Sequence, residues 1–94
     1  MGVLPSIELL EATHEFPCPF MFKVIGRGED GFAARVVAAV RDELAEDVDP
    51  PHSLRATAGG RHVSVTLEPT VQTARQVLAV YRRVRTLRGL VMLL

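Results

Sequence analysis

The sequence contains one cysteine, one lysine and no tryptophan, and it has no long run of apolar residues. A single thiol cannot form an internal disulfide, which is typical of proteins in a reducing cytoplasm. No segment approaches the roughly 20 consecutive apolar residues that a membrane-spanning helix needs. The N-terminal segment carries Glu8, Glu11 and Glu15 where a secretory signal would carry basic residues. We therefore expect a cytoplasmic protein that does not engage a membrane.

Charge is balanced in number but unevenly distributed along the chain. The 94 residues carry 11 Lys and Arg and 11 Asp and Glu. Residues 1–50 hold ten acids and four bases, whereas residues 51–94 hold seven arginines and Glu68 as their one acid. This asymmetry is typical either of a basic binding face or of two halves that pair with each other. The length and the hydrophobic fraction of 48% indicate one domain over residues 1–94, with residues 1–16 as a short N-terminal arm or helix.

The chain is organised around residues 15–32, EFPCPFMFKVIGRGEDGF, which predict a buried strand, a glycine-containing loop and the start of a helix. Residues 20–25 are apolar on both faces except at Lys23, so the strand should be central in its sheet. The two-residue period places Phe20, Phe22 and Val24 on the core face and Met21, Lys23 and Ile25 on the opposite face. A short helix over residues 5–12 precedes this segment, with Pro5 at its start and Ser6 as a weaker capping candidate.

Two later segments show the three- and four-residue apolar spacing of amphipathic helices. The first covers residues 31–46 with Asp30 as its expected cap, and the second covers residues 70–87 with Thr70 as its cap. Between them, residues 53–58 and 62–67 alternate apolar and polar side chains, and Gly59-Gly60 predicts a hairpin turn with positive φ angles. Gly89 ends the second helix, and residues 90–94 predict a last strand.

The predicted order β-α-β-β-α-β is that of a ferredoxin-like α+β sandwich. Right-handed crossovers give a four-stranded antiparallel sheet of order 4-1-3-2, with both helices on one face. The expected core contains Phe20, Phe22, Val24, Phe32, Val40, Val63, Val65, Val77 and Tyr81. The open face of the sheet is expected to carry Met21, Lys23, Ile25, Arg55, His62, Ser64, Thr66, Val91 and Leu93. Because this face and the last strand remain exposed, we expect self-association or binding to another protein.

Gly26, Gly28 and Gly31 match the spacing of the dinucleotide-binding fingerprint, after a strand and before a helix. The next segment, however, predicts an antiparallel hairpin rather than a second parallel unit. Glu29 and Asp30 also place negative charge where a pyrophosphate would bind. We therefore interpret these glycines as requirements of the backbone in a turn.

No constellation of metal ligands or catalytic groups is evident in the sequence. The soft ligand candidates are Cys18, His14, His52 and His62, and no two of them have a recognised metal spacing. Cys18 and His14 lie four residues apart before a proline-rich turn, and no orienting group accompanies them. We expect no metal, no cofactor and no enzymatic activity.

A basic cluster at the end of the second predicted helix consists of Arg82, Arg83, Arg85 and Arg88. Such a cluster can contact phosphates, but cations at a helix C-terminus also interact favourably with the helix dipole. The antiparallel helices would in addition bring Glu29 and Asp30 toward Arg82, Arg85 and Arg88. The open sheet face lacks the stacking aromatics of an RNA-binding sheet, so we do not expect nucleic-acid binding.

Taken together, FPCPFMFKVIG, the glycine-rich step into a helix, GGRHVSVTLE and the closing LVMLL resemble the YbeD-like family of small bacterial proteins. The most specific part comprises Phe16, Pro17, Phe20, Lys23, Val24, Gly26 and residues 63–66, and the resemblance extends over residues 7–94. It implies a domain similar to amino-acid-sensing ACT regulatory domains, in proteins loosely linked to lipoate metabolism, and it supplies no catalytic residues. The arginine-rich second helix and Val91 depart from the family pattern.

The resemblance also indicates where a ligand would bind, because ACT-like domains hold amino acids against the corresponding loop. We expect the loop to expose backbone N–H groups, Arg27 to pair with a carboxylate, and Glu29 or Asp30 to meet an amine. The candidate ligand site is Gly26, Arg27, Gly28, Glu29, Asp30 and Gly31. The expected function is a regulatory domain that senses a small carboxylate or amino-acid-like ligand. The alternative is a ligand-free adaptor that binds another protein.

Overall fold

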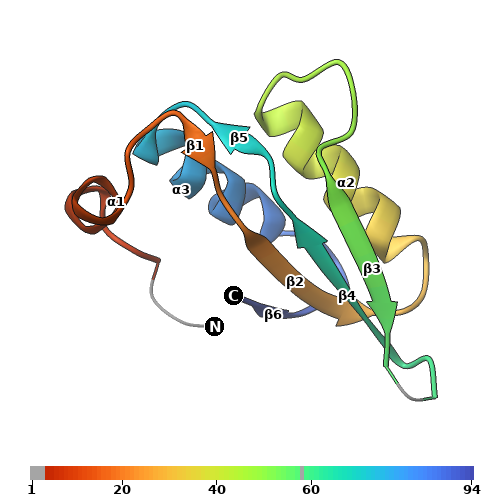
Figure 1. Ribbon diagram of the computed structural model, residues 1–94. Coiled ribbons are helices and arrows are strands. Elements are labelled where there is room, and N and C mark those ends of the chain that lie inside the picture. The colour runs from red at the N-terminus through yellow and green to blue at the C-terminus, as the bar shows by residue number, and fades with distance from the viewer. Residues whose placement is uncertain (1–3, 58) are drawn as a thin grey trace.

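The computed structural model describes residues 4–57 and 59–94 (Figure 1). The elements are α1 (Ile7–Thr13), β1 (Cys18–Pro19), β2 (Phe22–Arg27), α2 (Phe32–Glu43), β3 (His52–Ala56), β4 (His62–Leu67), β5 (Thr70–Val71), α3 (Ala74–Val84) and β6 (Leu90–Leu93). Strands β3-β4-β2-β6 form one antiparallel sheet in that order. This order is the predicted 4-1-3-2, and the ferredoxin-like α+β sandwich is confirmed.

One face of the sheet forms the core together with α2 and α3, which pack against each other (Figure 1). Phe22 and Val24 of β2 and Val65 and Leu67 of β4 alternate onto this face and are fully buried. The predicted core residues are buried except for Val63, which is half-buried. Val63 lies between Gly26 of β2 and Ala56 of β3, and these small residues cover little of its side chain.

The central strand begins and ends two residues later in the sequence than predicted. It begins at Phe22 rather than residue 20 and extends to Arg27, because its ladder with β4 continues through Gly26↔Val63 and Arg27↔His62. Gly26 and Arg27 are therefore strand residues and not loop residues. The loop that carries the candidate ligand site is correspondingly shorter.

The expected helix caps differ in two of three cases. Ser6, the weaker capping candidate, caps α1, which begins at Ile7 and not at Pro5; its Oγ accepts a hydrogen bond from the Leu9 amide at 3.1 Å. Asp30 does not cap α2; the residue before the helix is Gly31, at φ 64°, and no side chain accepts from the first turn. The cap of α3 is Thr73 rather than Thr70. Thr70 instead belongs to the two-residue strand β5, which pairs with β1.

The N-terminal helix α1 packs on α3 through the buried Leu10. Gly59 and Gly60, in the connection between β3 and β4, have the expected positive φ angles of 84° and 69°. Within the described residues, no helix combines the length and the apolar character needed to span a membrane.

Candidate functional site

The predicted ligand-binding residues fall into two environments. Gly26 lies in β2 between β4 and β6 and is buried. A methyl group at this position would overlap the ring of Phe32, the first residue of α2. Gly26 therefore allows α2 to pack closely on the sheet and is not available to a ligand. The other predicted residues, from Arg27 to Gly31, are exposed.

The expected free backbone N–H groups are largely occupied within the protein. Arg27 donates to the Gly89 carbonyl at 2.9 Å and Gly28 to the Arg61 carbonyl at 3.0 Å. Glu29 donates back to the Arg27 carbonyl at 2.8 Å. The expectation of an amide-lined ligand site at these three positions is therefore wrong, because β2 extends further and engages its neighbours. Recognition at this loop would have to come from side chains.

Arg35 connects the loop to the segment before β6. Its Nε donates to the Asp30 carbonyl at 3.1 Å, and its Nη1 donates to the Arg88 carbonyl at 2.9 Å. The guanidinium group also lies 5.5 Å from the centre of the Phe32 ring. These contacts hold one positive charge in a fixed position beside the loop.

A cleft of about 290 Å³ lies at this position, and we refer to it as the arginine cleft. It is lined by Arg27, Glu29, Asp30, Arg35, Arg88, Gly89 and Leu90. Three of these residues are arginines and two are acids. Among residues 4–57 and 59–94, the ion pairs are Arg41–Asp42, Arg41–Asp49 and Arg83–Glu43, and none involves a residue of this cleft. Residues of both charge signs therefore line one cavity, and none of the ion pairs among the described residues joins them.

The helices do not bring all of the expected opposite charges together. Arg88 lines the arginine cleft with Glu29 and Asp30, as expected, whereas Arg82 and Arg85 do not line it. The observed ion pair between α2 and α3 joins Arg83 Nη1 and Glu43 Oε1 at 3.6 Å. Part of the charge asymmetry of the sequence is thus resolved between the two long helices.

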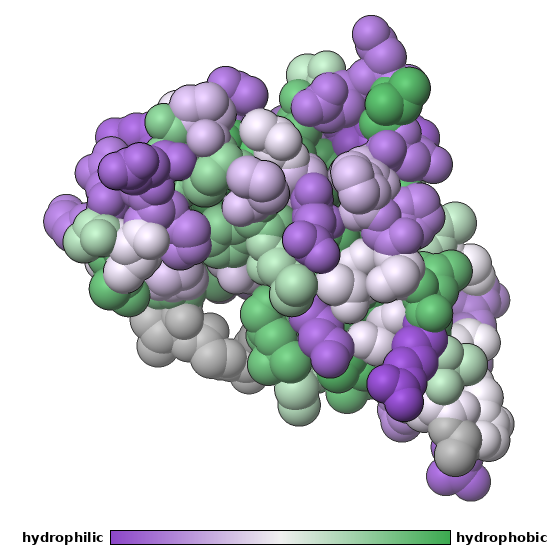
Figure 2. Space-filling model, in the orientation of Figure 1, coloured by the Kyte–Doolittle hydropathy of each residue, from purple (hydrophilic) through white to green (hydrophobic). Residues whose placement is uncertain are grey.

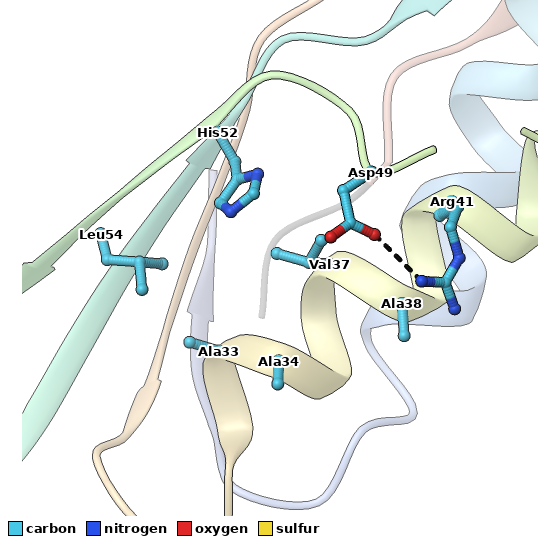
Figure 3. A pocket seen from close by; sticks show the side chains of 8 residues that line it. All are labelled: Ala33, Ala34, Val37, Ala38, Arg41, Asp49, His52 and Leu54. Carbon is cyan, nitrogen blue, oxygen red and sulfur yellow. Dashed lines mark hydrogen bonds and ion pairs between the residues drawn. The ribbon is translucent and has the colours of Figure 1, made fainter. Parts of the chain in front are cut away.

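A groove runs along the other side of α2, between this helix and β3 (Figure 3). This α2–β3 groove has a volume of about 350 Å³ and is lined by Ala33, Ala34, Val37, Ala38, Arg41, Asp49, His52 and Leu54. Arg41 and Asp49 form an ion pair of 3.0 Å at one end, and hydrogen bonds to Asp42 and Asp49 raise the pKa of the Arg41 guanidinium. A second cavity of about 400 Å³ shares Ala33 and continues toward the loop at residues 28–31.

The open face of the sheet combines cationic, hydroxyl and apolar side chains. The register places Lys23 beside Thr66, Ile25 beside Ser64 and Arg27 beside His62. Ser53 and Arg55 of β3 lie on the far side of Thr66 and Ser64. The four strands of the sheet contain no acidic residue. Figure 2 shows apolar surface interrupted by hydrophilic residues rather than one broad apolar patch.

The prediction for the last strand is wrong at Leu93. Leu93 pairs with Val24 and packs against the core, whereas Met92 pairs with Ile25 and is 47% exposed. The reason is a register shift between Ile25 and Gly26, where β6 contains one additional residue. Met92 therefore takes the place on the open face that was expected for Leu93. Val91 is exposed beside it at this irregularity, and Met21 is exposed just ahead of β2.

Two of the soft ligand candidates, His14 and His52, make local contacts. The His14 ring lies 5.0 Å from the Phe20 ring and within 2.9 Å of the Thr13 hydroxyl. His52 Nδ1 lies 2.8 Å from the Pro50 carbonyl oxygen. In the part of the chain that the structure describes, no group of three His, Cys, Asp or Glu residues is placed to hold a metal ion.

Comparison with known proteins gives consistent matches over most of the chain. A family model described as "Protein of unknown function (DUF493)" matches residues 11–94. The chain is similar to the UPF0250 protein of Shewanella woodyi, with 36% identity over 75 residues, which is 80% of this chain and 83% of the relative. UPF0250 proteins of Shewanella piezotolerans and Shewanella oneidensis are 37% and 33% identical over the same length, with the same coverage. The matched family segment includes the whole sheet, both long helices and the arginine cleft.

Proposed function

The chain belongs to the DUF493 family, and the UPF0250 proteins it matches are the YbeD-like proteins that its sequence resembles. On this premise we propose that the chain is a non-catalytic regulatory domain. In this proposal the arginine cleft binds a small molecule that carries both a carboxylate and an amine, as an amino acid does. The binding event would take place in the bacterial cytoplasm.

One observation carries the proposal: residues of both charge signs line the same cleft and form no ion pair with a described residue. Arg27 and Arg88 are exposed, and neither forms an ion pair with a described residue. Glu29 and Asp30 line the same cavity. Unpaired charges in a concave site are a typical feature of a site that binds a charged ligand.

The chemistry of the cleft favours a zwitterion over a simple anion. A guanidinium group binds a carboxylate with two parallel hydrogen bonds, which Arg27 or Arg88 can supply. An ammonium group would be stabilised by Glu29 or Asp30. These same carboxylates would repel a phosphate, whose charge is concentrated and entirely negative. Arg35 is held by two carbonyl oxygens and would place one fixed positive charge at the site.

Binding without catalysis agrees with the lining of the cleft. The residues that line it are arginines, acids, Gly89 and Leu90, with no serine, cysteine or histidine. A covalent mechanism needs a nucleophile beside a base and an orienting group. We therefore assign this site to recognition of a ligand and not to its conversion.

A second candidate function, protein-binding adaptor, is supported by the open face of the sheet. This face has no acidic residue in its strands and combines Lys23 and Arg55 with Ile25 and Met92. An apolar centre beside cations suits an acidic partner protein. Replacing Lys23 and Arg55 by glutamate would abolish such an interaction and leave the arginine cleft unchanged.

Calorimetric titration of the purified protein with single amino acids and with lipoate-like carboxylic acids tests the first proposal. We expect at least one zwitterion to bind, and the Arg88→Ala variant to bind it roughly 10- to 100-fold more weakly, since hydrogen bonds to charged groups contribute about 1.5–3 kcal/mol. Asp30→Asn retains a residue that tolerates the left-handed backbone at φ 55° and should weaken binding through the loss of charge.

Arg75→Ala is the matched control, because Arg75 is exposed on α3 and does not line the cleft. Binding that Arg88→Ala and Asp30→Asn leave unchanged would assign the ligand to another surface. A panel in which no compound binds would remove the sensing function and leave the adaptor.

A further inference from the structure

Strand β3 lies at the edge of the sheet and pairs with β4 alone. All five of its residues are exposed, and the Leu54 side chain is 55% exposed although it is on the same face as the core. An exposed edge strand with apolar character is a template for pairing with a further strand. Arg55 does not block this edge, since it is on the open face beside Ser64.

The backbone of β3 has its free hydrogen-bonding groups at three positions. At one end of the ladder the Thr57 amide donates to the His62 carbonyl at 3.0 Å, and at the other the Glu68 amide donates to the Pro51 carbonyl at 2.9 Å. In an antiparallel ladder, hydrogen-bonded and non-hydrogen-bonded pairs alternate. Ser53 and Arg55 therefore point their backbone groups toward β4. His52, Leu54 and Ala56 point theirs outward.

The α2–β3 groove provides space for the side chains of an added strand. Figure 3 shows Leu54 and His52 from β3 on one side and Ala33, Val37 and Ala38 from α2 on the other. The adjoining cavity extends this space toward Ala56 and Val63. Side chains on the helix side of a strand paired to β3 would lie over a floor of small apolar residues.

We propose that a second copy of this chain occupies this edge, with β3 of each copy paired antiparallel about Leu54. The arrangement is two-fold symmetric, so Leu54 faces Leu54 of the second copy and Ser53 faces Arg55 of the second copy. His52 and Ala56 face each other in the same way. No like charges are opposed. The outward backbone N–H and C=O groups of His52, Leu54 and Ala56 would hydrogen-bond to the same groups of the second copy.

Charge complementarity at the ends of β3 supports a second copy over an unrelated strand. The connection before β3 carries Glu46, Asp47 and Asp49, and the connection after it carries Arg61. Figure 1 shows these two connections at opposite ends of β3. Antiparallel pairing about Leu54 brings the acidic end of one copy beside the basic end of the other, and it does so twice.

The other edge of the sheet is less suited to this role. Strand β6 is shorter than β3, with four residues, and its register with β2 shifts between Ile25 and Gly26. Short, irregular strands are a common means of preventing edge-to-edge pairing. Strand β3 has neither feature over residues 52–56.

Sedimentation equilibrium of the full chain over a range of concentrations tests this assembly independently of any ligand. We expect a monomer–dimer equilibrium, which Leu54→Asp weakens by about tenfold or more because two carboxylates would face each other. Circular dichroism should show the same folded spectrum, since Leu54 is largely exposed. Met92→Asp is the control on the open face and should leave the dimer unchanged.

A charge exchange tests the register. Asp47→Arg alone and Arg61→Asp alone should each weaken the dimer, and the variant that carries both should regain it. A wild-type chain that is strictly monomeric at millimolar concentration overturns the assembly. A dimer that resists Leu54→Asp, dissociates with Met92→Asp, or is not regained in the double variant overturns this interface.

Discussion

Replacing Gly26 by alanine tests why the central strand carries a glycine where it passes beneath α2. A Cβ atom at this position would meet the ring of Phe32. Phe32 is 1% exposed and is the first residue of α2, so moving its ring disturbs the packing of this helix on the sheet. The structure therefore predicts that alanine at this position overpacks the contact between helix and sheet.

The magnitude follows from two opposing terms. In an unobstructed position, Gly→Ala stabilises a protein by about 0.4–1 kcal/mol through the entropy of the unfolded chain. Overpacking of a well-packed core costs about 1–3 kcal/mol. We expect a net loss of about 1–2 kcal/mol in the free energy of unfolding. For a domain of this size that loss lowers the melting temperature by about 4–16 °C.

A double-mutant cycle with Phe32→Leu isolates the contact. The smaller side chain should relieve the overlap, so the double variant should be more stable than the sum of the two single changes by about 1 kcal/mol. Gly59→Ala is the control: nothing lies within 4 Å of its added Cβ, and its cost comes from its φ of 84°. Its effect should add to that of Phe32→Leu. Thermal melts followed by circular dichroism supply every value.

Two results would refute this account of Gly26. The first is a Gly26→Ala variant that melts at or above the wild-type temperature. The second is strict additivity with Phe32→Leu, which would mean that the glycine serves something other than the approach of α2.

Two further predictions concern the core. Val65→Asp would place an ionised carboxylate at a site that is 0% exposed, which costs several kcal/mol. We therefore expect no cooperative melt of this variant. A transition near the wild-type temperature would contradict the packing of β4. Burial raises the pKa of Tyr81 above its ordinary value of 10.0, so the folded state retains the phenolic proton more tightly than the unfolded state. The contribution of Tyr81 to the free energy of unfolding is therefore complete below pH 10.0 and falls as the pH rises above it. Denaturant melts should show this decrease for the wild type and not for Tyr81→Phe.

The sequence predicts the fold because its apolar periods are regular where the sheet and the helices are regular. Phe22 and Val24 alternate with Lys23, and Val65 alternates with Ser64 and Thr66, as the paired strands require. The irregular parts are missed for a physical reason. One additional residue in β6 moves Leu93 to the core face, and the prolines beside Cys18 conceal a strand of two residues.

The glycine motif illustrates how far a pattern of residues can be interpreted. Each of its three glycines is required for a different reason. Gly26 leaves room for the Phe32 ring, and Gly31 adopts a φ of 64°. A Cβ at Gly28 would lie 2.8 Å from the carbonyl oxygen of Gly60. Spacing alone indicates that glycine is needed and does not distinguish these causes.

The arginine cleft was predictable only in part. Arg27, Glu29 and Asp30 are neighbours in the sequence and could be assigned together. Arg35 and Arg88 are separated by 53 positions, and the hydrogen bond from Arg35 to the Arg88 carbonyl depends on the packing of α2 against the end of the sheet. No local signal in the sequence indicates that contact.

The most direct test of the proposed ligand site follows backbone amide chemical shifts while amino acids and lipoate-like acids are titrated into the labelled protein. The account predicts saturable shifts at Arg27, Glu29 and Asp30 and at Gly89, with little change at Leu54 or Arg75. If no compound at millimolar concentration moves these amides, or if the shifts occur only on the open face of the sheet, the arginine cleft is not a ligand site.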